Sequence, residues 1–203
     1  EFMKEGGRSI DVSQGIPLVQ IPGNASRLQG DLHLFGNPHY WTDPVNATMI
    51  AKNIAEGLSE MVPEDADWFR GNAAAFQEKI EKNLQDWKKR LAPYEGEFVV
   101  TYHDSWPYLL NRFGLVLLDT IESNPGISPT PKHISNLIQN MKMKAVKVII
   151  KESYQESSTP KKIAQETGAR VLNFAQNVGE TKEAKDTISM MESNVRLLEE
   201  ALA

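Results

Sequence analysis

Cysteine is absent from the 203 residues of the sequence. Disulfide bonds, thiolate zinc sites and cysteine nucleophiles are therefore excluded. A metal site in this chain must be built from histidine, aspartate, glutamate or water. Histidine is itself scarce, and the four candidates are His33, His39, His103 and His133.

Long apolar runs and an excess of positive charge are also missing. No apolar run approaches the ~18–20 residues that a membrane-spanning helix requires. The formal net charge of −5 argues against a nucleic-acid partner, which would need a clustered basic face. The sequence has neither a glycine-rich phosphate loop nor the GxSxG turn of serine hydrolases. The run "HDSW" (103–106) places His, Asp and Ser side by side, but sequence neighbours alone do not make a catalytic triad.

The first third of the chain predicts little regular structure before two helices. Glycine and proline interrupt residues 1–30, where we expect loop and one strand in "IPLVQI" (16–21). Asp43-Pro44 predicts a helix start, because Asp caps well and Pro suits the first turn, so a helix should span 44–61. Apolar residues at helical spacing then predict a second helix over 64–91, about 40 Å long at 1.5 Å per residue.

The rest of the chain alternates buried strands with amphipathic helices. Strands are predicted at "EFVVTY" (97–102), "LVLLDTI" (115–121), "VKVIIK" (146–151) and "RVLNF" (170–174). Helices are predicted at 104–114, 131–142, 159–168 and 182–203. This alternation indicates an α/β fold with a four-stranded parallel sheet covered on both faces. Ligands in such folds bind at the carboxyl ends of the strands, where His103 and Glu152 fall.

Each candidate residue also has a plainer interpretation. His39 follows a proline, just before the helix start, and could be a loop histidine that is hydrogen-bonded to backbone. His103 could equally be a structural histidine, and Glu152 could form a cap or a salt bridge. His33 could be a ligand, a residue that supports a ligand, or a surface residue. His133 falls in the first turn of a helix among polar neighbours, and we expect it to be exposed.

Four longer motifs carry more information than periodicity does. They are "GNPHYWTDP", "VTYHDSWPYLLNRFGL", "KIAQETGARVL" and "ISMMESNVRLLEEAL". Together they resemble the zinc- and manganese-specific solute-binding proteins of bacterial ABC importers, and the resemblance covers about residues 30–203. In that family the first two motifs each supply a metal-binding histidine. The resemblance therefore implies that His39 and His103 bind metal, with His33 as a further ligand or a supporting residue.

The resemblance also implies a function. We expect a non-enzymatic receptor that captures a divalent metal ion, Zn²⁺ first and Mn²⁺ as the alternative, and delivers it to an ABC permease in the membrane. Its location would be periplasmic or extracellular, with a lipid anchor as an option for the full-length protein. The alternative is a protein-interaction module, similar to an adhesin, with a vestigial metal site. A metal-dependent hydrolase is the least favoured class, since no nucleophile or general base can be named.

The resemblance divides the chain into three parts, and the sequence departs from the family pattern in places. The expected parts are a remnant of the N-terminal lobe (1–62), a connector helix (63–92) and a C-terminal α/β lobe (97–203). Most of the first lobe has no counterpart here, and Ala175 stands where we align a metal-binding aspartate. We also expect a homodimer or swapped dimer, which would bury apolar surface on helix 44–61.

These expectations have geometric consequences for the two histidines. If His39 and His103 share one ion, their ring nitrogens should converge on one point. The other nitrogen of each ring should be held by a carboxylate or a backbone carbonyl. Water, His33 or Glu152 would have to complete the ligand shell, so we expect weak binding in this chain and tighter binding once a first lobe is present. Affinity should fall between about pH 7 and pH 5.5, because protons compete for imidazole.

Overall fold

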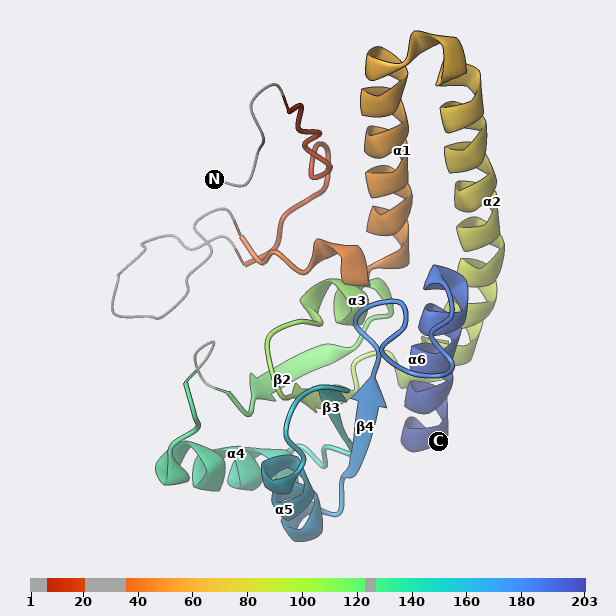
Figure 1. Cartoon of the computed structure of the whole chain (residues 1–203). Coiled ribbons are helices and arrows are strands. Elements are labelled where there is room, and N and C mark those ends of the chain that lie inside the picture. The colour runs from red at the N-terminus through yellow and green to blue at the C-terminus, as the bar shows by residue number, and fades with distance from the viewer. Residues whose placement is uncertain (1–6, 21–35, 123–126) are drawn as a thin grey trace.

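The computed structural model describes residues 7–20, 36–122 and 127–203. It shows a body built on one sheet, from which two long helices rise side by side (Figure 1). The sheet has four parallel strands in the order β2-β1-β3-β4. Their bounds are β1 Phe98–Thr101, β2 Val116–Thr120, β3 Val148–Glu152 and β4 Arg170–Phe174. The predicted α/β fold with a four-stranded parallel sheet is confirmed.

Helices cover both faces of the sheet and create two separate cores. The helices of the body are α3 (Pro107–Arg112), α4 (Pro131–Met143), α5 (Ser158–Thr167) and α6 (Thr187–Leu202). Successive side chains of β1 point to opposite faces, as a strand requires. Val99 packs in a core with Leu109 of α3 and Leu198 of α6. Val100 belongs to the other core, which α4 and α5 cover.

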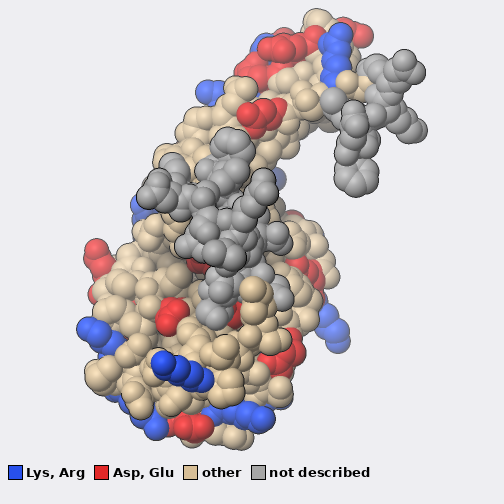
Figure 2. Space-filling model, turned by 90° about the vertical axis from the view of Figure 1, so that its left-hand side faces the viewer, with Lys and Arg blue, Asp and Glu red and all other residues tan. Residues whose placement is uncertain are grey.

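The two long helices are α1 (Pro44–Met61) and α2 (Ala66–Leu91), joined by the 3-10 turn Pro63–Asp65. Asp43 starts α1 as predicted, since its side-chain oxygen accepts the Val45 N–H at 2.8 Å. The predicted second helix is present, with its first residues in the 3-10 turn. Acidic side chains gather at the far end of this hairpin (Figure 2), where the chain places Glu60, Glu64, Asp65 and Asp67.

One end of α2 is anchored to the body. Its buried residues are Ile80, Trp87 and Leu91, all in the C-terminal half of the helix. Arg90 contacts Glu192 and Glu199 of α6, each at 2.8 Å. The indole N–H of Trp87 also donates to Glu192 at 2.8 Å. The N-terminal half of α2 packs on α1 instead.

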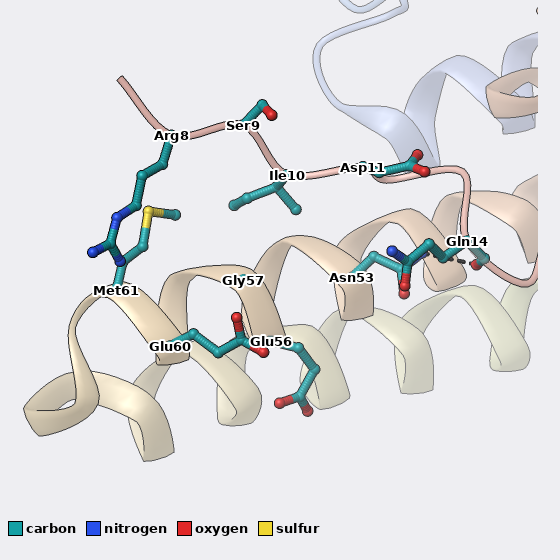
Figure 3. A pocket seen from close by; sticks show the side chains of 10 residues that line it. All are labelled: Arg8, Ser9, Ile10, Asp11, Gln14, Asn53, Glu56, Gly57, Glu60 and Met61. Atoms are coloured by element: carbon teal, nitrogen blue, oxygen red, sulfur yellow. Dashed lines mark hydrogen bonds between the residues drawn. The ribbon is translucent and has the colours of Figure 1, made fainter. Parts of the chain in front are cut away.

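The N-terminal segment lies along α1 rather than in a sheet. The Asn53 amide donates to the carbonyls of Val12 and Gln14, at 3.0 and 2.9 Å. Ile10 sits directly over Gly57, where an added Cβ would come within 2.7 Å of the Ile10 side chain. Figure 3 shows the pocket that this segment forms with α1 between Arg8 and Gln14.

Two sequence predictions need correction. Residues 16–20, the described part of "IPLVQI", form no strand. Pro17 has no N–H to donate, and Gln20 adopts a left-handed φ of 56°; both features disfavour a regular ladder there. The last helix begins at Thr187 rather than at residue 182, because Asp186 and Ser189 form a capping box at that point.

Candidate metal centre

His39 and His103 lie next to each other at the carboxyl edge of the sheet. His103 follows β1, and His39 lies in the loop that leads through the 3-10 turn Tyr40–Thr42 into α1. Their ring centroids are 5.4 Å apart, with the ring planes at 89°. The structure thus brings together two of the three histidines that the sequence singled out.

Asn37 holds the loop of His39 against the segment that follows β1. Its side-chain carbonyl accepts the backbone N–H of His39 at 2.9 Å, and its amide donates to the carbonyl of Asp104 at 2.8 Å. Its own backbone carbonyl accepts the Tyr108 hydroxyl at 2.7 Å. Asn37 is buried, so these bonds replace its contacts with water. The loop positions of the two histidines are therefore coupled through one side chain.

Glu122 is the partner of His103. Its carboxylate oxygen lies 2.6 Å from His103 Nδ1, and both side chains are mostly buried. A carboxylate accepts hydrogen bonds, so Nδ1 carries the proton and the lone pair of Nε2 faces away from Glu122. This is the expected carboxylate partner. Glu122 was not predicted from the sequence, although it follows the second predicted strand at the same edge of the sheet.

Gln176 is the partner of His39. The amide Nε2 of Gln176 lies 3.0 Å from His39 Nδ1, where we expected a carboxylate or a backbone carbonyl. Its Oε1 lies 3.0 Å from the Tyr154 hydroxyl, and the residue is only 4% exposed. The ring of Trp41 packs edge-on against His39, with centroids 5.2 Å apart. Gln176 follows β4 and was not predicted from the sequence either.

Ala175 and Glu152 occupy the two positions where the sequence sought a carboxylate. The Ala175 backbone is clamped by Asn194 of α6, which accepts its N–H at 3.1 Å and donates to its carbonyl at 2.9 Å. Glu152 is fully buried and accepts the Trp106 indole N–H at 2.9 Å. Burial raises the pKa of its carboxyl group, and the other carboxyl oxygen has no hydrogen-bond partner within the described part of the chain.

The other two histidines are placed differently. His33 lies outside the described residues. His133 was expected to be exposed, but it is half-buried, and its Nε2 lies 2.8 Å from the Thr120 carbonyl. This contact ties the start of α4 to the end of β2. Across residues 7–20, 36–122 and 127–203, no cluster of three or more His, Asp or Glu side chains is arranged to hold a metal ion.

The separation of the two ring centroids is compatible with a shared zinc ion. A ring bound at about 2.0–2.1 Å has its centre about 3.2 Å from the ion, so two rings at a tetrahedral angle have centres about 5.2 Å apart. The observed separation of 5.4 Å is close to this value. Two imidazoles fill only half of a tetrahedral shell, so further donors are needed.

The family of the chain is shown by comparison with known proteins. The profile of the family described as zinc-uptake complex component A, periplasmic, matches residues 2–201. A match over nearly the whole chain means that this protein belongs to that family. The resemblance inferred from the sequence motifs is thereby confirmed.

Individual relatives agree with this membership. The zinc-binding protein AdcA of Streptococcus pyogenes is 28% identical over 174 residues, which are 84% of this chain and 34% of AdcA. The high-affinity zinc uptake system protein ZnuA of Brucella abortus is 29% identical over 132 residues, 65% of this chain and 40% of that protein. The chain therefore spans less than half the length of these relatives.

A solved structure gives the same fold. The laminin-binding protein Lmb of Streptococcus agalactiae, described as bifunctional with adhesin and metal-transporting activity, superposes with a TM-score of 0.79 at 26% identity. The match covers 96% of this chain and 71% of Lmb. Among the described residues of this chain, no helix is both long and apolar enough to cross a membrane.

Proposed function

We propose that this chain is the metal-binding part of an extracytoplasmic solute-binding protein that captures a divalent metal ion for an ABC importer. The observation that carries the proposal is the pair of imidazoles at the sheet edge, 5.4 Å apart and contributed by two separate loops. Family membership and the similarity to the zinc-binding protein AdcA support it.

The donor set favours zinc. Neutral imidazole is a preferred ligand of Zn²⁺, whereas Mn²⁺ favours carboxylate and water oxygens. We assign His39 and His103 as ligands through Nε2 and His33 as the third donor, with water or a carboxylate completing the shell. Mn²⁺ is the alternative cargo, and it would need more oxygen donors than these three residues provide.

We propose a division of the chain into three parts that places the two histidines in different parts. Residues 1–62 are proposed as the remnant of a first lobe, 63–92 as the connector helix and 97–203 as the second lobe. His39 would then come from the loop at the base of the first part and His103 from the second lobe. The metal is cargo rather than a reactant, so we assign no catalytic residue.

The partners follow from the role. The metal would pass to an ABC permease in the membrane, and the receptor would work in the periplasm or outside the cell. A lipid anchor on the full-length protein is consistent with the description of the pneumococcal relative AdcA as a zinc-binding lipoprotein. A homodimer or swapped dimer of this chain would cover the part of α1 that lies outside the body.

A second candidate function is adhesion. The Lmb structure, which is described as having both adhesin and metal-transporting activity, is the observation that favours it. In this alternative the chain binds another protein, and the histidine pair is vestigial. Zinc binding distinguishes the two functions, because an adhesin with a vestigial site does not need it.

Zinc titration by calorimetry tests the proposal. The parent chain should bind one zinc ion weakly, and His103→Ala and His39→Ala should abolish this binding without changing helical content. His133→Ala is the matched histidine control, since its ring contacts the Thr120 carbonyl. Unchanged zinc affinity in His103→Ala would contradict the ligand assignment. A parent chain that binds no zinc while a longer chain with a first lobe does would place the missing donors in that lobe.

A further inference from the structure

The two histidines have chemically different partners. Glu122 offers His103 a carboxylate, which only accepts a hydrogen bond. Gln176 offers His39 an amide, whose NH₂ end donates and whose carbonyl end accepts. In the structure the NH₂ end faces His39 Nδ1, and the carbonyl end faces the Tyr154 hydroxyl. The side chains of His39, Gln176 and Tyr154 thus form a chain of hydrogen bonds.

The direction of these bonds determines which nitrogen of His39 can bind metal. When the amide donates to Nδ1, that nitrogen uses its lone pair, so the proton of a neutral imidazole is on Nε2. An Nε2 that carries a proton has no lone pair for a metal ion. Binding through Nε2 requires the other tautomer, in which Nδ1–H donates and its neighbour accepts.

Gln176 can act either as the donor or as the acceptor to His39 Nδ1 with little movement. Rotating the amide by half a turn exchanges its oxygen and nitrogen in almost the same positions. The backbone of Gln176 is held in place, since its N–H donates to Glu180 at 2.8 Å and its carbonyl accepts the Trp41 indole N–H at 3.4 Å. Only the amide group needs to turn.

Tyr154 can also form a hydrogen bond with the Gln176 amide in both orientations of the amide. A phenolic hydroxyl donates to the amide oxygen in one orientation and accepts from the amide NH₂ in the other. Partial burial and the nearby carboxylates of Glu152 and Glu180 raise the pKa of Tyr154 to about 12. The hydroxyl therefore keeps its proton, and both roles remain open to it at neutral pH.

We propose that Gln176 and Tyr154 form a neutral relay that positions His39, and that its hydrogen bonds reverse direction when metal binds. Without metal, Gln176 donates to Nδ1; with metal on Nε2, it accepts from Nδ1–H and donates to Tyr154. One proton leaves His39 Nε2 for solvent and one proton is taken up from solvent at Nδ1, so the net protonation of the ring is unchanged. The relay rests on the proposed function, in which His39 is a ligand.

The relay makes the two ligands unequal. His103 is held in its metal-binding tautomer before metal arrives, because Glu122 cannot donate to it. His39 must change tautomer, so part of the binding free energy is spent on reversing the relay. An acceptor-only residue at position 176 would remove this requirement.

Nitrogen-15 NMR of the imidazole rings tests the relay directly. In the metal-free chain, His39 should show a proton on Nε2 and His103 a proton on Nδ1. After zinc is added, both rings should show a proton on Nδ1 and metal on Nε2, with His103 as the internal control. A proton on Nδ1 of His39 already in the metal-free chain would overturn the relay. The expected metal-free tautomer with no zinc-induced change at His39 would instead contradict its role as a ligand.

Substitutions at both ends of the relay give a second test by zinc titration. Gln176→Leu should weaken zinc binding about 10–100-fold, as expected when the partner of a metal-binding histidine is lost. Gln176→Glu should bind at least as tightly as the parent. Tyr154→Phe should lower zinc affinity a few-fold. Because Tyr154 is 62% exposed, the variant is expected to fold.

The controls separate the two proposals. Gln77→Leu, on the exposed face of α2, should not change zinc affinity. If His39→Ala abolishes binding while Gln176→Leu and Tyr154→Phe bind like the parent, the relay is wrong and the ligand assignment stands. If His39→Ala binds like the parent, the proposed ligand set itself is wrong.

Discussion

Arg112 and Asp43 form a two-pronged ion pair between α3 and the start of α1. The Arg112 Nη2 and Nε atoms lie 2.8 and 3.0 Å from the two carboxylate oxygens of Asp43. The carboxylate also caps α1 and is nearly buried. One side chain therefore fixes both the helix start and its attachment to the body, just after the loop of His39.

Asp43→Ala should destabilise the fold by about 2–4 kcal/mol, because it removes a helix cap and leaves Arg112 without its partner. Asp43→Asn keeps a capping oxygen and should lower the free energy of unfolding by less than Asp43→Ala does. Denaturant unfolding followed by circular dichroism measures both. Equal stability of Asp43→Ala and the parent would show that the pair contributes nothing.

Glu122→Gln should lower zinc affinity about 10–100-fold, since the neutral amide is a weaker acceptor for His103 Nδ1–H and can also donate. The measurement is a zinc titration at fixed pH and salt. Glu166→Gln, at an exposed position on α5, is the matched control. An affinity equal to that of the parent would mean that Glu122 does not support His103 as a ligand.

Glu156 makes α5 sensitive to acid. Desolvation acts to raise its pKa, but hydrogen bonds from Ser158 and Thr159 outweigh this and lower it to about 2. A group whose pKa is lower in the folded state stabilises above its unfolded pKa, near 4.3, and loses that contribution as pH falls toward 2. The stability difference between the parent and Glu156→Gln should therefore be largest at neutral pH and shrink between about pH 4.5 and pH 2. A difference that is constant over this range would contradict the assignment.

Gly57→Ala should release the segment around Ile10. Alanine normally stabilises a helix interior by about 1 kcal/mol over glycine, but here its Cβ would overlap the Ile10 side chain at 2.7 Å. We expect faster hydrogen exchange in residues 8–14 with little loss of global stability. The double variant Ile10→Ala with Gly57→Ala should be free of this overlap, so it should show the stabilisation of α1 expected for alanine over glycine. Unchanged exchange in the single variant would show that Ile10 moves aside at no cost.

Local patterns predicted the elements well where one interaction determines them. The capping aspartate at position 43 and the proline after it located the start of α1, and the short apolar run at β4 located Arg170–Phe174 at both ends. The prediction was wrong for 16–20, where Pro17 lacks an N–H and the stretch ends in the left-handed φ of Gln20. A single backbone angle of this kind cannot be detected in the hydrophobic periodicity of the sequence.

The partners of the histidines could not be found in the same way. Glu122 meets His103 because β2 pairs with β1, and Gln176 meets His39 because the loop before α1 reaches the residues that follow β4. Strand order depends on long-range packing, which residue spacing does not encode. The histidines themselves were identified because their motifs resemble a known family.

Because α2 buries large side chains only from Ile80 onward, the two ends of the hairpin should differ in how readily they open. The turns near Ala66 have α1 as their support, so they should unfold locally at a free energy well below that of the whole protein. The loop of His39 joins the opposite end, where α1 and α2 meet the sheet body. Fraying at the tip would therefore leave the imidazole pair undisturbed, and the amide protons of α2 should exchange in a gradient that slows toward Leu91.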